Sequence, residues 1–148
     1  MANDLGVLNG IFDKDPQAWL KLLGWPGKFT EKIENADETY VVDRAIHARN
    51  PEYIGLFDFQ AAYDPTQPTR LRRAAKLAQA TYDCPARCAA ILLVDRADGP
   101  AITGTLEDEG GQFDYHVLRI WRISSNIFLE GSIHLLPLAV ISDVGNRR

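Results

Sequence analysis

Residues 89–94 form an uninterrupted apolar run, Ala-Ala-Ile-Leu-Leu-Val. A run of this length is typical of a β-strand, and because no polar residue alternates with the apolar ones, both faces of the strand should be buried. Such a strand needs a layer of structure on each side of its sheet. The run therefore favours an α/β fold with a mixed sheet flanked by helices, in which this strand lies near the centre.

Helix and strand patterns surround this run. Pro16 is suited to the first position of a short amphipathic helix, and aromatic and polar residues that alternate after Gly55 indicate a strand. The turn residues Glu109-Gly110-Gly111 indicate a hairpin. We expect helices over residues 16–23, 28–34 (a turn or two), 69–82 and 124–129, strands over residues 39–48 and 53–61, and a hairpin between residues 100–106 and 113–123.

The composition indicates one globular domain spanning residues 1–148. The chain has 148 residues, of which 46% are hydrophobic and 24% are charged. No apolar run reaches the roughly 18 residues that a membrane span needs, and the first ten residues lack the features of a signal peptide. The expected location is therefore the cytoplasm, without membrane contact.

The charge argues against a protein that coats nucleic acid without specificity. The formal net charge is −4 and the isoelectric point is near 5.3, whereas such binding rests on clustered cations that neutralise phosphates. Charge is local, however, and one basic cluster falls on the helix expected over residues 69–82. Its members are Arg70, Arg72, Arg73 and Lys76.

Asp58 and Gln60 are the sharpest candidates for a site. The period of a strand puts both side chains on one face, and a hairpin around residues 50–52 would bring Asp43 of the preceding strand to the same edge. Two carboxylates are hard oxygen ligands of the kind that Mg²⁺ prefers, and they leave positions for water and a substrate phosphate. The same spacing is common on solvated strands, so spacing alone leaves both interpretations open.

A longer stretch, VVDRAIHARNPEYIGLFDFQAAYDPTQPTRLRR at residues 41–73, resembles the recombination-promoting nuclease (Rpn) family of the PD-(D/E)XK nuclease superfamily, also described as transposase-like. In that family a strand with an Asp is followed by a hydrophobic strand that ends in an acidic residue, any residue and Gln, and then by an Arg-rich helix. GPAITG, FDYHVLRIW and IHLLPLA resemble later blocks, so the resemblance runs from about residue 13 to residue 142.

The resemblance implies a restriction-endonuclease-like core and DNA cleavage that depends on a divalent metal, Mg²⁺ or Mn²⁺. Asp43 and Asp58 would be the metal-binding acids, and the Phe59 carbonyl would supply another oxygen. Gln60 would stand where the superfamily usually has Lys; because an amide can orient a water but cannot act as a cationic base, the metal must do more of the activation. The DNA backbone would be held by Arg70, Arg72, Arg73 and Lys76.

Two other functions are compatible with the sequence. The Rpn family more typically has Glu at the position of Asp58, so the chain can be a non-catalytic relative that keeps the fold as a nucleic-acid-binding or protein-binding module. It can also be a small assembly domain, a homodimer for example, whose exposed apolar segment at residues 135–141 packs on a partner. Family members often continue into a helical C-terminal region, which we expect this chain to lack.

Overall fold

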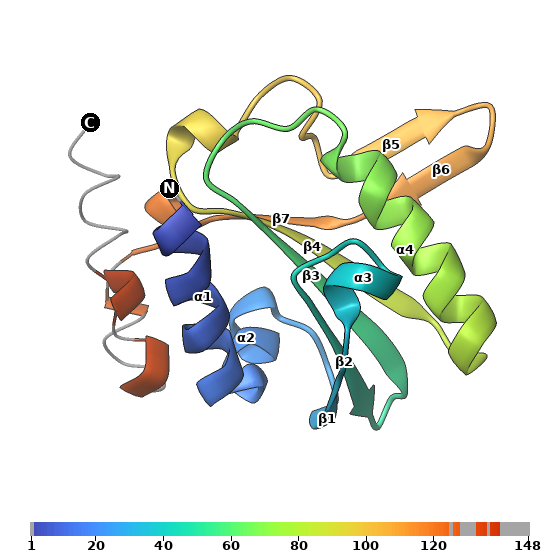
Figure 1. Cartoon of the computed structure of the whole chain (residues 1–148), viewed down its shortest axis with the longest axis horizontal. Coiled ribbons are helices and arrows are strands. Elements are labelled where there is room, and N and C mark those ends of the chain that lie inside the picture. Colours follow the sequence, from blue (N-terminus) through green and yellow to red (C-terminus); the bar gives the residue numbers. More distant parts are fainter. Residues whose placement is uncertain (1, 125, 128–132, 136, 140–148) are drawn as a thin grey trace.

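The computed structural model describes residues 2–124, 126–127, 133–135 and 137–139. A mixed sheet of five strands, in the order β1-β2-β3-β4-β7, forms its centre (Figure 1). Strands β1, β2 and β3 are antiparallel neighbours, whereas β3, β4 and β7 are parallel. The strands are β1 (Lys28–Ile33), β2 (Arg44–Arg49), β3 (Tyr53–Gln60), β4 (Ala86–Leu92) and β7 (His116–Arg119).

Helices cover both faces of this sheet (Figure 1). On one face lie α1 (Ala2–Lys14) and α2 (Pro16–Leu23), and on the other lies α4 (Gln67–Tyr82). Strand β3 contributes to both cores, because its aromatic residues Phe57 and Phe59 pack with α1 and α2 while Ile54 and Leu56 pack with α4. The expected α/β class, with a mixed sheet between helices, is confirmed.

The apolar run forms an interior strand, as expected. Strand β4 pairs with β3 on one side and with β7 on the other. Ala89 and Ile91 are buried in the core under α1 and α2, and Ala90 and Leu92 are buried in the core under α4. From Cys88 to Leu92 neither face of the strand meets water, which explains why this part of its sequence lacks alternation.

Two expectations about residues 28–48 need correction. Residues 28–34 are not helical, because β1 is an edge strand that pairs with β2 along its length. The strand expected over residues 39–48 begins only at Arg44, after a short helix α3 (Ala36–Thr39). Val41 has a φ of 56°, and a left-handed residue breaks an extended strand. Asp43 thus lies just before β2 rather than within it.

The predicted hairpin forms, but it stands apart from the main sheet. Strands β5 (Thr105–Asp108) and β6 (Gly111–Asp114) pair only with each other, and the chain then enters β7. The stretch expected to be one strand over residues 113–123 is therefore divided between two sheets. An ion pair of 2.7 Å between Arg72 and Asp108 ties α4 to the hairpin.

The apolar segment at residues 135–141 is mostly buried where the structure describes it. Leu135, Leu138 and Ala139 are buried in the core that α1 and α2 cover. The expectation of an exposed segment at residues 135–141 is therefore wrong for these three residues. Pro137 is exposed, and residues 136, 140 and 141, like part of the helix expected over 124–129, lie outside the described ones. Within the described ranges, no helix combines the length and apolar character that a membrane crossing requires.

Candidate functional site

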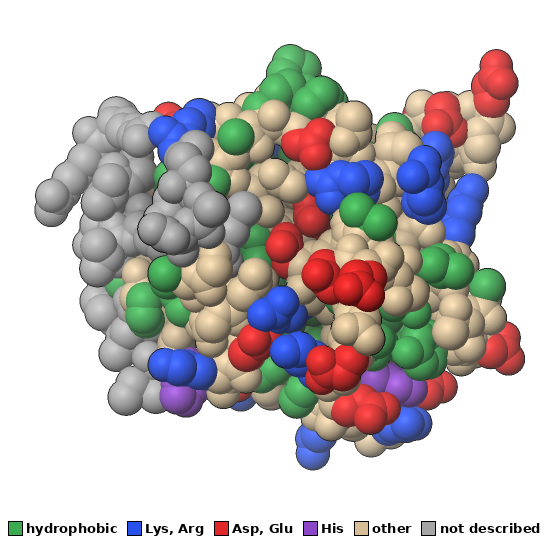
Figure 2. Space-filling model, viewed as in Figure 1, with side chains coloured by type: hydrophobic (Ala, Val, Ile, Leu, Met, Phe, Trp, Pro, Cys, Tyr) green, Lys and Arg blue, Asp and Glu red, His purple; other side chains and the backbone are tan. Residues whose placement is uncertain are grey.

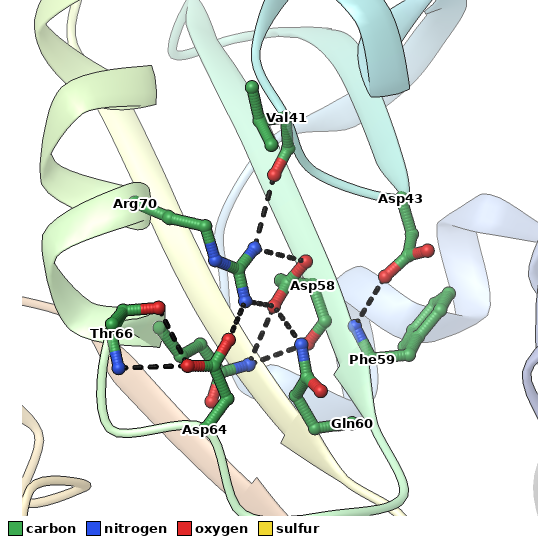
Figure 3. A network of polar contacts seen from close by, with 9 residues as sticks. Val41, Asp43, Asp58, Phe59, Gln60, Asp64, Thr66 and Arg70 are labelled. Carbon is green, nitrogen blue, oxygen red and sulfur yellow. Dashed lines mark hydrogen bonds and ion pairs between the residues drawn. The ribbon is translucent and has the colours of Figure 1, made fainter.

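Asp58 projects from β3 toward the side of the sheet that α4 covers, as do the apolar residues two and four positions before it. On the neighbouring strand, Arg44 lies opposite Phe57, and the Asp43 N–H donates to the Phe57 carbonyl at 3.1 Å. Asp43 thereby extends the pairing of β2 with β3 by one residue. The two aspartates come to lie beside each other (Figure 3).

Asp43 lies in a partly desolvated position next to a second acid. Its Oδ2 accepts a hydrogen bond of 2.7 Å from the Phe59 N–H. Burial, with the negative charge of Asp58 as a further cause, raises the pKa of Asp43 to about 6, against the opposing effects of the Phe59 N–H and the Arg44 cation. The aspartates thus form a close pair of like charge, which a proton or a cation would stabilise.

Asp58 is only 3% exposed, and three side chains donate hydrogen bonds to its carboxylate. Gln60 and Gln67 each donate Nε2 to Oδ2 at 2.9 Å. Arg70 donates Nη1 to Oδ1 at 3.2 Å and Nη2 to Oδ2 at 3.1 Å (Figure 3). Three of these four bonds reach Oδ2 and one reaches Oδ1, so Oδ2 is saturated while Oδ1 keeps an acceptor position.

Arg70 connects Asp58 to two further groups. Its Nη2 also donates to Oδ2 of Asp64 at 2.8 Å, and its Nη1 donates to the carbonyl of Val41 at 3.2 Å. Asp64 is itself fixed, because its Oδ1 accepts hydrogen bonds from the backbone N–H and the hydroxyl of Thr66 at 2.9 and 2.6 Å. Burial alone would raise the pKa of Asp64, but the bonds from Thr66 and Arg70 hold that pKa below its ordinary value.

Gln67 is a site residue that the sequence interpretation missed. It is fully buried in the first turn of α4, and its Nε2 also lies 3.3 Å from the Asp58 carbonyl. Its Oε1 is buried without a hydrogen-bond partner among the described residues. In the sequence, the Gln67-Pro68 dipeptide indicates only that the preceding strand has ended. The usable signal was the spacing of three residues from Gln67 to Arg70, which places both on one helix face.

The four basic residues expected to bind DNA divide into two pairs. Arg70 is held by Asp58 and Asp64 at the site, and Arg72 is paired with Asp108 of the hairpin. Arg73 and Lys76 are exposed on α4. The first pair would have to give up internal contacts to bind phosphate, so the DNA-binding role stays a prediction that the structure favours most for Arg73 and Lys76.

A metal at this site would need oxygen ligands, and the residues present fit that requirement. Asp43, Asp58 and the unpartnered Oε1 of Gln67 are hard oxygen donors of the kind that bind Mg²⁺ or Mn²⁺. The Phe59 backbone meets Asp43 through its N–H, and the ligand role of its carbonyl stays a prediction. In the described part of the chain, no three His, Cys, Asp or Glu side chains group in a way that could hold a metal, so the acidic ligands would number two.

A pocket of about 310 Å³ opens beside the site. Asp43 and Arg44 line it together with residues from α1 and from the segment around α3. Figure 2 shows Asp and Glu side chains gathered in the middle of the face that carries α1, α3 and α4, with Lys and Arg side chains among them. A polyanion would meet repulsion on this face unless added cations offset the acids.

Comparisons with known proteins find no significant match to this chain. No protein-family model matches the sequence, no curated protein is significantly similar to it, and no solved structure is significantly similar to its fold. The fold and the geometry of the site stand on their own, and membership of the Rpn family stays a proposal.

Proposed function

We propose that the chain is a divalent-metal-dependent DNA endonuclease of restriction-endonuclease-like fold, related to the Rpn family, in which Asp43 and Asp58 hold the metal. The observation that carries this proposal is the placement of the two carboxylates side by side at the β2–β3 pairing, with Gln60 bonded to one of them. The pocket beside Asp43 provides a way for a substrate to approach.

Each residue has a role that follows from its chemistry. Mg²⁺ or Mn²⁺, when bound, would lower the pKa of a water and offset charge on the reacting phosphate. Asp43 and Asp58 provide the negative oxygens that compensate a hard cation for the water it loses. Gln60 has an amide that can donate to one group and accept from another, so it orients a water and does not remove its proton. Its Nε2 is fixed on Asp58 at 2.9 Å, which limits where the rest of the amide can lie.

Supercoiled plasmid tests this proposal directly. The purified chain should nick or linearise the plasmid with Mg²⁺ or Mn²⁺ and should leave it intact with EDTA. Replacing Asp43 with Ala or Asn removes one of two acidic ligands, so the rate should fall by about 100-fold or more, as at other sites that depend on positioning. The matched control is Asp114→Asn, which removes the charge of an exposed acid on β6. Equal cleavage by wild type and Asp43→Ala would reject the assignment.

The proposal assigns sequence-independent DNA contacts to Arg73 and Lys76. Reversing both charges, Arg73→Glu with Lys76→Glu, should weaken binding to unrelated duplexes alike and reduce the salt slope of log K by about two, close to 0.9 for each phosphate that is no longer neutralised. Fluorescence anisotropy measures the affinity and its salt slope between roughly 50 and 200 mM salt, where the affinity changes strongly with salt. The matched control is Lys14→Glu with Lys21→Glu, which makes the same charge change on α1 and α2. An unchanged slope would remove α4 from the interface.

One observation favours a second candidate, a non-catalytic module that retains the fold. Asp58 is already neutralised by Arg70 and accepts four hydrogen bonds, which is also what a purely structural buried acid would do. The two candidates differ in metal binding. A nuclease must bind Mg²⁺ or Mn²⁺ through Asp43 and Asp58, whereas a structural ion pair need not.

A further inference from the structure

Arg70 is a cation that already occupies the candidate metal site. Its guanidinium bonds both oxygens of Asp58, one oxygen of Asp64 and the carbonyl of Val41, at 2.8 to 3.2 Å. The Arg70 side chain is 21% exposed and that of Asp58 is 4% exposed, so the pair is largely shielded from water. Screening by salt is weak for such a pair, and its attraction is correspondingly strong.

A metal ion on Asp58 would compete with the donors that the carboxylate already has. Gln60, Gln67 and Arg70 saturate Oδ2 with three hydrogen bonds, and Arg70 also bonds Oδ1. The two amides are neutral and can remain near a cation. The guanidinium is positive, and two cations on one buried carboxylate repel each other. Arg70 is therefore the donor that a metal would displace.

The structure also holds a place for the displaced guanidinium. Asp64 accepts the shortest of the Arg70 bonds, at 2.8 Å, and its side chain is 30% exposed, so this contact lies toward the surface. Thr66 fixes Asp64 through two hydrogen bonds. Arg70 can thus leave Asp58 and remain paired with Asp64, which lowers the cost of the movement.

Gln67 provides an independent sign that the site has a second state. With Arg70 on Asp58, Gln67 donates Nε2 to the carboxylate, and its buried Oε1 has no hydrogen-bond partner among the described residues. An unpaired buried acceptor is costly. Rotation of the amide would exchange the two atoms and present an oxygen to a cation on Asp58. The buried oxygen is unsatisfied with Arg70 in place. After the rotation it would face a metal on Asp58, and Nε2 would take the position that has no described partner.

We propose that Arg70 is a resident cation that keeps Asp58 closed to metal, and that a divalent ion binds by displacing Arg70 toward Asp64. This inference rests on the proposed metal site of the nuclease and adds the competition that sets its metal affinity. When a binding-competent state is populated only in part, the apparent affinity falls by that fraction. Removing the competitor should therefore tighten metal binding.

Calorimetric titration of the full chain with Mn²⁺, in the absence of DNA, tests the competition. Arg70→Met should bind Mn²⁺ about tenfold more tightly than wild type, as expected if Asp58 is open about a tenth of the time. Arg70→Lys should bind with intermediate affinity, because one ammonium cannot hold Asp58, Asp64 and Val41 together. The matched control is Arg72→Met on the same helix, which also breaks an Arg–Asp pair and should bind like wild type. Asp43→Asn should lose binding.

Thermal unfolding with and without Mn²⁺ gives a second measurement. Mn²⁺ should raise the melting temperature of Arg70→Met by more than it raises that of wild type, because the ion replaces the missing counter-charge. If Arg70→Met does not fold without metal, recovery of its far-UV circular dichroism on refolding with Mn²⁺ supports the inference. The inference is overturned if Mn²⁺ does not restore the fold of Arg70→Met and Arg70→Lys binds Mn²⁺ no more tightly than wild type.

The outcomes separate this inference from the proposed function. If wild type binds Mn²⁺ and Asp43→Asn does not, while Arg70→Met and Arg70→Lys bind no more tightly than wild type, the competition is rejected and the metal site stands. If Arg72→Met gains as much as Arg70→Met, the effect is one of overall charge and the competition is again rejected. If no variant binds Mn²⁺, both the metal site and the competition fall.

Discussion

Arg70→Met should lower the free energy of unfolding by about 3–5 kcal/mol in metal-free buffer at neutral pH, the usual cost of leaving one partner of a buried ion pair alone. Asp58 is 3% exposed and would lose its only described ion-pair partner and two of its four hydrogen bonds. Methionine keeps much of the length of the arginine stem, so the loss of packing is small by comparison. Urea unfolding in EDTA, followed by circular dichroism, measures the effect.

Arg72→Met is the control for this result. Arg72 lies two residues further along α4 and pairs with Asp108, an acid with 42% of its side chain exposed. Exposed pairs contribute little to stability, so this variant should stay close to wild type. The double variant Asp58→Asn with Arg70→Met removes both charges and should recover part of the loss, which appears as a coupling energy in the double-mutant cycle. Equal destabilisation by Arg70→Met and Arg72→Met would show that Asp58 does not depend on Arg70.

The elements that could be predicted from sequence are those whose local pattern and burial agree. The interior strand β4 and the helices α2 and α4 have such patterns. Strand β3 was also predicted, from its alternation, although its polar Asp58 is buried. Strand β1 was misread because it is an edge strand with mostly exposed residues, and its structure comes from pairing with β2 rather than from its own pattern. The helix α1 was not anticipated at all, although its Leu8 and Phe12 are fully buried against the sheet.

The site divides in the same way. Asp58 and Gln60 could be placed on one face from the period of a strand, and the β2–β3 pairing brings Asp43 beside them. The role of Arg70 could not be derived, because a basic residue on a helix looks the same in sequence whether it faces phosphate or a buried acid. Asp64 and Gln67 precede prolines, and in the sequence these dipeptides indicate only the end of the preceding strand. Only the packing of α4 on β3 shows that they surround Asp58.

Asp58→Asn should abolish metal-dependent cleavage, with a loss of about 100-fold or more. The amide keeps the shape of the side chain but lacks the negative oxygen that offsets dehydration of a hard cation. Its NH₂ group would also face donors of Gln60, Gln67 and Arg70, so the variant should be less stable as well. Cleavage is therefore compared with wild type at a temperature where circular dichroism shows both proteins folded.

Asp58→Glu distinguishes a site that needs charge from one that needs only an aspartate. Glutamate keeps the charge and moves the carboxylate by on the order of 1 Å, a displacement that matters where positioning sets the rate. Because the Rpn resemblance implies Glu at this position, the variant should retain or raise cleavage, even though the added methylene must fit a buried position at a cost of about 1–3 kcal/mol in stability. Equal cleavage by wild type and Asp58→Asn would place the activity elsewhere. A wild type that is inert, beside an Asp58→Glu variant that cuts, would identify a disarmed nuclease, because a single methylene would then separate the binding module from the enzyme.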